Sequence, residues 1–272
     1  MKNTILTIKQ QQRIAPDTCE MVLQAAGTDA AVLEEVRPGQ FINIKIDGFY
    51  LRRPISICDW DAAAGTITII YKTVGQGTEA MSRMTAGQEL DILWPLGNGY
   101  DLGCLPQRPL LIGGGAGVPP MYGLCRKLAE AGARPQVILG FRSAADVFYQ
   151  EKFQALGARV LITTEDGSAG IRGFVTDAMA ALETGSAAAL GAGSAEEHAN
   201  ESAYDGVFAC GPEPMLRAVD QNAPAEIPGQ MSFEERMGCG FGACMGCSCE
   251  TKYGAKRICK DGPVLERSEI IW

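Results

Sequence analysis

Hydrophobic and polar positions alternate with period two through much of the first hundred residues. This pattern is typical of half-buried β-strands, which present successive side chains to opposite faces of a sheet. Pro-Gly and Ala-Gly pairs, which favour turns, separate the segments. Many short strands at this spacing predict an antiparallel β-barrel in residues 1–101, with a short helix at Thr78–Met84. The predicted strands include Phe41–Ile46, Thr66–Lys72 and Glu89–Trp94.

From Arg108 onward, short apolar runs alternate with segments of helix length. This alternation predicts a parallel, doubly wound α/β sheet, which we assign to residues 102–228. The stretch 184–202 is rich in Ala, Gly and Ser, and its low complexity predicts a mobile insertion. The predicted strands are Pro109–Gly113, Gln136–Gly140, Arg159–Thr163 and Gly206–Ala209, and the predicted helices are Val118–Ala131, Tyr149–Leu156, Phe174–Leu182 and one after Pro214.

The last segment, residues 229–272, is too short for a core of its own, so we expect it to pack against both preceding domains. Its cysteines follow the spacing Cys239-x4-Cys244-x2-Cys247, with Cys259 after a predicted hairpin through residues 252–256. This is the plant-type ligand pattern of a [2Fe–2S] cluster. Glycines between the cysteines allow backbone N–H groups to point at sulfur and offset its negative charge.

Ten cysteines admit other interpretations. The polar start Met1–Lys9 does not resemble a secretory leader, so we expect a cytoplasmic chain with reduced thiols rather than disulfides. A structural zinc site usually has two Cys-x2-Cys pairs, whereas this chain has one, so zinc stays the weaker alternative. Cys249 is predicted to be a non-ligand. Four further cysteines with apolar neighbours are predicted to be small core residues: Cys19, Cys58, Cys104 and Cys125.

Composition narrows the class of function. The 272 residues carry a net charge of −8, which gives no basic footprint for nucleic acid, and no apolar run is long enough to span a membrane. The single histidine, His198, lies in the low-complexity stretch. Because the chain lacks the commonest general acid–base residue, we predict no catalytic side chain and favour a carrier of electrons or hydride over a hydrolase.

Glycine-rich segments point to nucleotides. Gly113, Gly115 and Gly117 lie between a predicted strand and a predicted helix, where a dinucleotide pyrophosphate approaches the backbone. Pro120 stands where a third glycine is usual, so this loop is weak evidence alone.

A second set of residues suits a flavin. Arg53 is placed to neutralise a pyrophosphate, and Ser56 to hydrogen-bond a flavin ring. The Gly77 and Thr78 amides begin the short helix and could bind the same pyrophosphate. In this order the segments resemble domains of the ferredoxin–NADP reductase type. The Cys210-Gly211-Pro turn resembles the turn that lies beside the nicotinamide in that superfamily.

Together with the cysteine segment and Cys259-Lys-Asp-Gly-Pro-Val264, the whole chain outside 184–202 resembles the electron-transfer subunits of dihydroorotate dehydrogenase type B. The resemblance implies that this chain holds FAD and a [2Fe–2S] cluster and passes electrons to NAD. It also implies a partner subunit that holds FMN and oxidises dihydroorotate to orotate for UMP synthesis, with two copies of each chain. This chain should then lack a dihydroorotate site of its own.

The resemblance assigns residues to each group. It places the cluster on Cys239, Cys244, Cys247 and Cys259, and FAD on Arg53, Pro54, Ile55, Ser56, Ile70, Tyr71, Lys72, Gly77 and Thr78. Ile55 replaces a flavin-stacking tyrosine common in the superfamily, and we expect Tyr71 to take over part of that packing. Arg142 follows a sheet strand where a cation would suit NADP, although the resemblance favours NAD.

Two alternative functions stay open at this level. A reductase subunit that serves a sulfite reductase or a hydrogenase would share the barrel, the sheet and a similar cysteine loop. A zinc-stabilised nucleotide-binding regulatory module would be a protein of another class.

Overall fold

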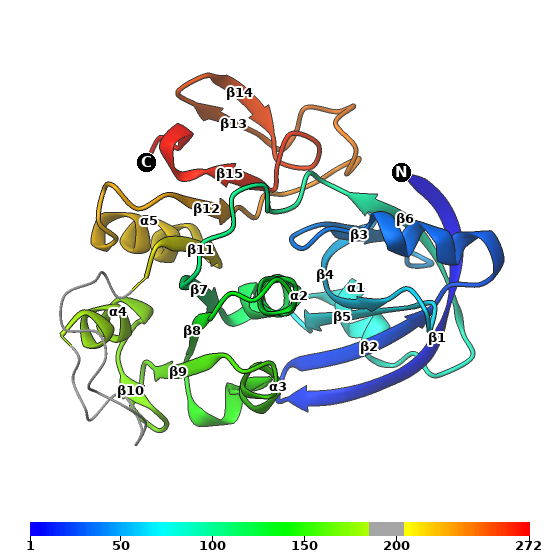
Figure 1. Ribbon diagram of the computed structural model, residues 1–272. Helices are drawn as coiled ribbons and strands as arrows, with labels where there is room; N and C mark the ends of the chain where they lie inside the picture. The colour runs from blue at the N-terminus through cyan, green and yellow to red at the C-terminus, as the bar shows by residue number, and fades with distance from the viewer. Residues whose placement is uncertain (185–203) are drawn as a thin grey trace.

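The computed structural model describes residues 1–184 and 204–272. A β-barrel, a seven-stranded sheet with helices and a smaller C-terminal segment lie in contact with one another (Figure 1). Apart from Thr184, the predicted insertion lies outside the described residues. Within the described ranges, no helix is both long and apolar enough to cross a membrane.

The barrel is closed and antiparallel, as predicted, with strand order β1-β2-β5-β4-β3-β6. Side chains such as Leu6, Ile42 and Trp94 fill its interior and are fully buried. The sequence analysis missed the first two strands, because polar residues occupy much of β1. The elements are β1 (Lys2–Ala15), β2 (Thr18–Gln24), a 3-10 helix (Gly27–Glu35), β3 (Phe41–Ile44), β4 (Arg53–Asp61), β5 (Thr66–Lys72), α1 (Gln76–Ser82) and β6 (Glu89–Leu96).

The sheet has the order β10-β9-β8-β7-β11-β12-β15 and is parallel except for β15. Alternate residues of β7 face opposite layers: Leu110 and Ile112 pack with α4 and α5, and Leu111 packs with α2. Helices therefore cover both faces, as a doubly wound sheet requires. The elements are β7 (Pro109–Gly114), α2 (Val118–Glu130), β8 (Gln136–Phe141), α3 (Gln150–Ala155), β9 (Arg159–Thr164), β10 (Ile171–Arg172), α4 (Val175–Glu183), β11 (Gly206–Cys210) and α5 (Glu213–Asn222).

The C-terminal segment contributes two strands to this sheet, β12 (Gly229–Ser232) and β15 (Val264–Glu266). Between them lie the cysteine loop and a hairpin of β13 (Ser248–Thr251) and β14 (Gly254–Arg257), which confirms the predicted hairpin. The division into 1–101, 102–228 and 229–272 remains our proposal for the domains.

Charged side chains join the barrel to the helices of the sheet. Glu20 on β2 is buried and accepts hydrogen bonds from the Tyr149 hydroxyl at 2.5 Å and from Lys152 Nζ at 2.9 Å. On β4, Asp59 Oδ1 accepts from Arg126 Nε of α2 at 2.8 Å. These residues form the ionic interface of the barrel.

Neutral amides join the barrel to the C-terminal segment. Asn98, just after β6, donates from Nδ2 to the carbonyls of Asp261 at 3.2 Å and Val264 at 2.8 Å, and its Oδ1 accepts from the Val264 N–H at 3.2 Å. Asn43 on β3 donates from Nδ2 to the Cys239 carbonyl at 3.4 Å. We call this contact the amide interface. The segment thus packs against both other parts, as predicted.

Three of the four cysteines predicted to lie in the core do so: Cys19, Cys58 and Cys125 are buried. The prediction for Cys104 was wrong, because it lies exposed in the connection between barrel and sheet. Neighbouring apolar residues in the sequence did not fold over it.

Candidate functional site

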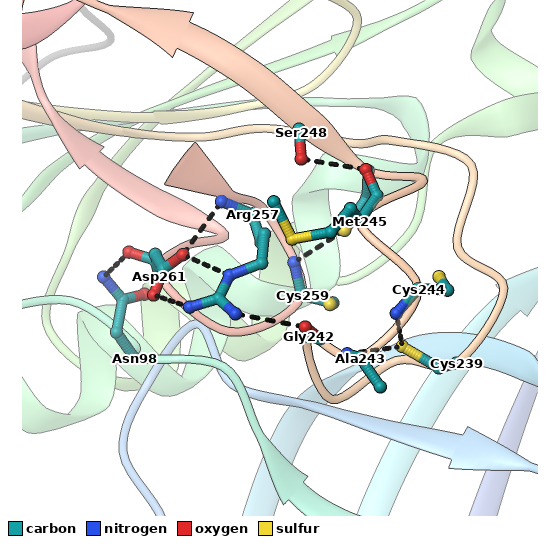
Figure 2. Close-up of polar contacts among 11 residues, drawn as sticks. Asn98, Cys239, Gly242, Ala243, Cys244, Met245, Ser248, Arg257, Cys259 and Asp261 are labelled. Carbon is teal, nitrogen blue, oxygen red and sulfur yellow. Dashed lines mark hydrogen bonds and ion pairs between the residues drawn. The ribbon is translucent and has the colours of Figure 1, made fainter. Parts of the chain in front are cut away.

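The four predicted cluster ligands form two pairs: Cys239 lies beside Cys244 (Figure 2), and Cys247 contacts Cys259. Among the described residues, no three of these side chains are already gathered closely enough to hold a metal ion. Cys239 Sγ accepts the backbone N–H groups of Ala243 at 3.2 Å and Cys244 at 3.5 Å. Cys247 Sγ accepts the backbone N–H of Cys259 at 3.4 Å. Cys244 is exposed, whereas Cys247 and Cys259 are buried. Two thiol pairs, each bound by amides, suit a centre with two irons.

The loop backbone favours thiolate at one end of the site. Burial raises the pKa of Cys239, but the N–H groups of Phe241, Cys244 and Ala243 outweigh burial and lower the pKa to about 6. Burial and the neighbouring Cys247 raise the pKa of the free Cys259 thiol to about 12. Soft thiolate donors with amide support are the donor set that iron–sulfur clusters use.

Arg257 fixes the shape of the loop from behind. Its guanidinium forms a two-point contact with Asp261, at 2.8 Å from Nε and 3.1 Å from Nη2, and also donates to the Gly242 carbonyl at 3.1 Å (Figure 2). A planar guanidinium is well suited to such forked contacts. The loop is therefore held in place by the hairpin that follows it.

Cys249 lies elsewhere. It lines a separate cavity of about 200 Å³ together with Phe233, Leu265 and Trp272. This placement supports its exclusion from the ligand set.

The predicted flavin residues lie on β4, β5 and α1 of the barrel. Arg53 begins β4 and packs directly on Gly77, where an added Cβ would lie 2.3 Å from Arg53 Nε. Only glycine allows the guanidinium to lie this close to the first turn of α1. Gly77 and Thr78 are buried under this guanidinium, and a cation beside the first turn of a helix is a suitable cradle for a pyrophosphate.

The other flavin candidates divide between two faces of the strands. Pro54 and Ser56 pair with Asn43 and Phe41 of β3, and cross-strand partners share a face. Ile55 packs against the barrel core instead.

The structure corrects the expected role of Tyr71. Its ring is only 3% exposed inside the barrel, and its hydroxyl donates to Gln11 Oε1 at 2.9 Å. The ring is therefore not placed to pack on a flavin, and only its backbone can contribute. Ile70 faces the core of the sheet, and Lys72 reaches a large cavity.

That cavity of about 650 Å³ lies where the parallel strands end. Its wall includes Gly114 at the end of β7, Gly115 just after it, Gly140 near the end of β8 and Thr163 on β9. The order of strands reverses between β7 and β11, and such a switch point is where α/β sheets bind nucleotides. The Thr163 hydroxyl is fully buried and, among the described residues, has no hydrogen-bond partner, so it suits a ligand hydroxyl.

The predicted nucleotide loops meet beside this cavity. Gly115 lines it, whereas Gly113, Gly117, Cys210 and Gly211 are not among its lining residues. A Cβ on Gly117 would lie 2.0 Å from the Cys210 carbonyl oxygen, so the start of α2 packs backbone to backbone against the Cys210–Gly211 turn. Gly113 is similarly close to Val118, with 2.8 Å from its Cβ position to the Val118 Cα. Cys210 is buried, and burial raises its pKa to about 12.

The sequence analysis missed several residues of the site. Glu165 and Glu234 line the cavity, and Asn43 contacts the cluster loop. None of these three residues belongs to a sequence motif. Glu165 could have been suspected, because it closely follows a predicted strand and ligands bind at the carboxyl ends of parallel strands.

This combination of barrel, sheet and cysteine loop defines a flavin reductase of the ferredoxin–NADP reductase type with an iron–sulfur segment. Family models match two parts of the chain: residues 234–271 match the iron–sulfur cluster binding domain of dihydroorotate dehydrogenase B, and residues 111–221 match the oxidoreductase NAD-binding domain.

Whole-chain comparisons are more specific. The electron transfer subunits of dihydroorotate dehydrogenase B (NAD(+)) from Bacillus caldolyticus and Bacillus pumilus (strain SAFR-032) are 39% and 41% identical to this chain. The alignments cover 98% and 99% of this chain and 97% and 98% of the relatives. The chain belongs to this family of electron transfer subunits.

A solved structure agrees in fold. The NADH-dependent reduced ferredoxin-NADP oxidoreductase, studied for flavin-based electron bifurcation, contains a chain with a TM-score of 0.83 and 28% identity. The match covers 100% of this chain and 91% of the other. FAD, an iron–sulfur cluster and NAD are the cofactors of this architecture, and the chain is an oxidoreductase subunit.

Proposed function

We propose that this chain passes electrons from a dihydroorotate-oxidising subunit to NAD. One observation carries the proposal: the cluster loop contacts the barrel at its flavin strands. The Cys239 carbonyl accepts a hydrogen bond from Asn43, and Asn43 is the sheet partner of Pro54, next to Arg53. A cluster on this loop and a flavin on β4 would be neighbours, as an electron relay needs.

FAD supplies the link between one-electron and hydride chemistry, since it accepts either one or two electrons. The chain's own residues would bind and orient the groups. Arg53, Gly77 and Thr78 hold the flavin pyrophosphate, and the loop at Gly113–Gly117 holds that of the nicotinamide nucleotide. The cluster ligands are Cys239, Cys244, Cys247 and Cys259.

We infer that the exposed side of the cluster loop faces the catalytic subunit. Cys244 is exposed there, and Phe241 and Met245 are large apolar side chains exposed by 42% and 55%. Exposed apolar residues around a redox centre favour a protein partner. That partner would hold FMN, pair with this chain as two copies of each in the cytoplasm, and supply orotate for UMP synthesis.

Substitution of one ligand tests the assignment. Cys244→Ser should remove iron and acid-labile sulfide from the purified chain, whereas FAD stays bound, since no flavin residue is altered. Cys249→Ser is the matched control and should keep both. Iron unchanged in Cys244→Ser, or stoichiometric zinc in place of iron in the parent protein, would overturn the cluster assignment.

The division of labour is tested separately. The chain alone should not oxidise dihydroorotate, and addition of an FMN-containing catalytic subunit should produce NADH from dihydroorotate and NAD. Dihydroorotate oxidation by the isolated chain would contradict this proposal, as would stable binding to a sirohaem or nickel enzyme instead.

A further inference from the structure

Arg142 presents a conflict in the proposed nicotinamide cavity. It directly follows β8, the strand beside β7, and it lines the cavity. In doubly wound sheets this is the region that reads the ribose next to adenine: a carboxylate accepts from the 2′-hydroxyl of NAD, and an arginine accommodates the 2′-phosphate of NADP. A free arginine here would favour NADP, whereas the relatives use NAD(+) by name.

The structure shows that the charge of Arg142 is engaged. Its Nη2 lies 3.6 Å from Asp17 Oδ2 and 3.6 Å from Asp146 Oδ1. Asp17 also lies 3.7 Å from the Nζ of Lys72. Among the described residues, Lys72 and Arg142 are the cationic side chains that line the cavity, so one carboxylate contacts both.

Asp17 belongs to a different proposed domain from Arg142. It lies in the turn between β1 and β2 of the barrel, whereas Arg142 belongs to the sheet. Its side chain is one-third exposed, at 34%, and Arg142 is 66% exposed, so both remain accessible to a ligand. The barrel therefore supplies a carboxylate that contacts two cationic residues of the cavity wall, although Asp17 itself is not one of the lining residues.

The rest of the wall adds negative charge. Glu165, just after β9, lines the same cavity. Glu234 lines it too, but burial raises the pKa of Glu234 and so weakens its contribution as a charge. The unpartnered Thr163 hydroxyl offers a neutral contact instead. A phosphate dianion would meet more carboxylates than free cations here, whereas a ribose hydroxyl could donate to a carboxylate.

We propose that Asp17, acting with Asp146 on Arg142, makes this cavity select a nicotinamide dinucleotide without a 2′-phosphate, and that Glu165 reinforces the selection. Asp17 is thus a positioning residue for Arg142, supplied by the flavin barrel. The inference rests on the proposed function, because it takes the cavity as the nicotinamide site.

The test compares two probes on the full chain loaded with FAD and cluster: 5′-AMP and adenosine 2′,5′-bisphosphate, titrated by calorimetry at low ionic strength. Asp17→Asn keeps the shape of the side chain and removes the carboxylate that Lys72 and Arg142 share, while Asp146 still neighbours Arg142. Because each exposed ion pair is worth up to about 1 kcal/mol, it should strengthen bisphosphate binding about fivefold. Binding of 5′-AMP should change less than about twofold. Addition of Arg142→Ala to Asp17→Asn should abolish the gain.

Glu130→Gln is the matched control, because Glu130 also contacts two cations, Arg126 at 2.8 Å and Lys127 at 2.9 Å, at the far end of α2. It should leave the ratio of the two affinities unchanged. A ratio that stays constant in Asp17→Asn, or shifts equally in Glu130→Gln, overturns the inference while the nicotinamide site stands. Failure of NADH and 5′-AMP to bind the parent chain overturns the site and the inference together.

Discussion

The barrel meets its two neighbours through different chemistry. Toward the sheet it uses the ionic interface, with Glu20 and Asp59 bound to cations of α2 and α3. Toward the cluster segment it uses the amide interface of Asn43 and Asn98. With a cluster bound, the four proposed ligand thiolates would concentrate negative charge in that segment, and neutral amides hold the loop without adding a carboxylate to them. The contribution of the ionic interface to stability should therefore depend on pH. The contribution of the amide interface should fall when its hydrogen-bonding side chains are removed.

The largest effect is expected for Asn98→Ala. Its side chain is exposed but makes three hydrogen bonds to the Asp261–Val264 turn, each worth about 0.5 kcal/mol there, so its removal should cost about 1.5 kcal/mol of unfolding free energy. Urea denaturation of the full chain measures this. Asn222→Ala removes a single hydrogen bond on the exposed side of α5 and should cost about 0.5 kcal/mol. Equal losses in the two variants would remove the distinction between the amide interface and an ordinary surface amide.

Asn43→Ala should have a smaller and more local effect. Asn43 is 1% exposed and makes one hydrogen bond to the Cys239 carbonyl, so about 1 kcal/mol is expected. Because that bond holds Cys239, a proposed cluster ligand, iron and sulfide should be lost faster on incubation with a chelator, at unchanged FAD content. Parallel loss of FAD and iron would mean that Asn43 supports the barrel and not the cluster loop.

The smallest effect is expected for Glu20→Gln, below about 1 kcal/mol, since Lys152 is half exposed. Burial raises the pKa of Glu20, but hydrogen bonds from Tyr149, Lys152 and Gln12 outweigh burial and hold the pKa below its ordinary 4.5. A lowered folded pKa stabilises the fold above pH 4.5, and this contribution is lost as the pH falls through the folded pKa. The stability difference between parent and variant should therefore shrink in acid. A difference that is constant from neutral pH into acid would contradict the ionic interpretation.

Features that depend on neighbouring residues in the chain could be predicted from the sequence. Three of the proposed cluster ligands, Cys239, Cys244 and Cys247, lie within one short stretch, so their spacing alone predicts that they share a loop. Regular strands such as β5 at Thr66–Lys72 also follow from local alternation, and the structure confirms them. The catalogue of flavin and nicotinamide contacts stays a prediction, because it came from motifs and not from contacts with a bound group.

Contacts between residues far apart in the chain could not be predicted from the sequence. Strands β12 and β15 pair across the cysteine loop, and Asp17 reaches Arg142 only because the barrel turn folds onto the sheet. Arg142 would suit NADP, but the residues alone did not decide between NAD and NADP. Its carboxylate neighbours bear on that choice, and one of them, Asp17, lies far away in the sequence. Tyr71 was likewise misjudged, since alternation along β5 turns its ring inward.

The pairing of β12 with β11 has a practical consequence for protein engineering. A chain truncated after residue 228 would leave β11 with bare N–H and C=O groups along an uncovered apolar edge. Such a fragment would be prone to self-association through this edge, whether or not iron is present. Attempts to study the barrel and sheet without residues 229–272, or to move those residues to another protein, should therefore give poorly soluble material. The cause would be the unpaired backbone of β11 and not the loss of the metal.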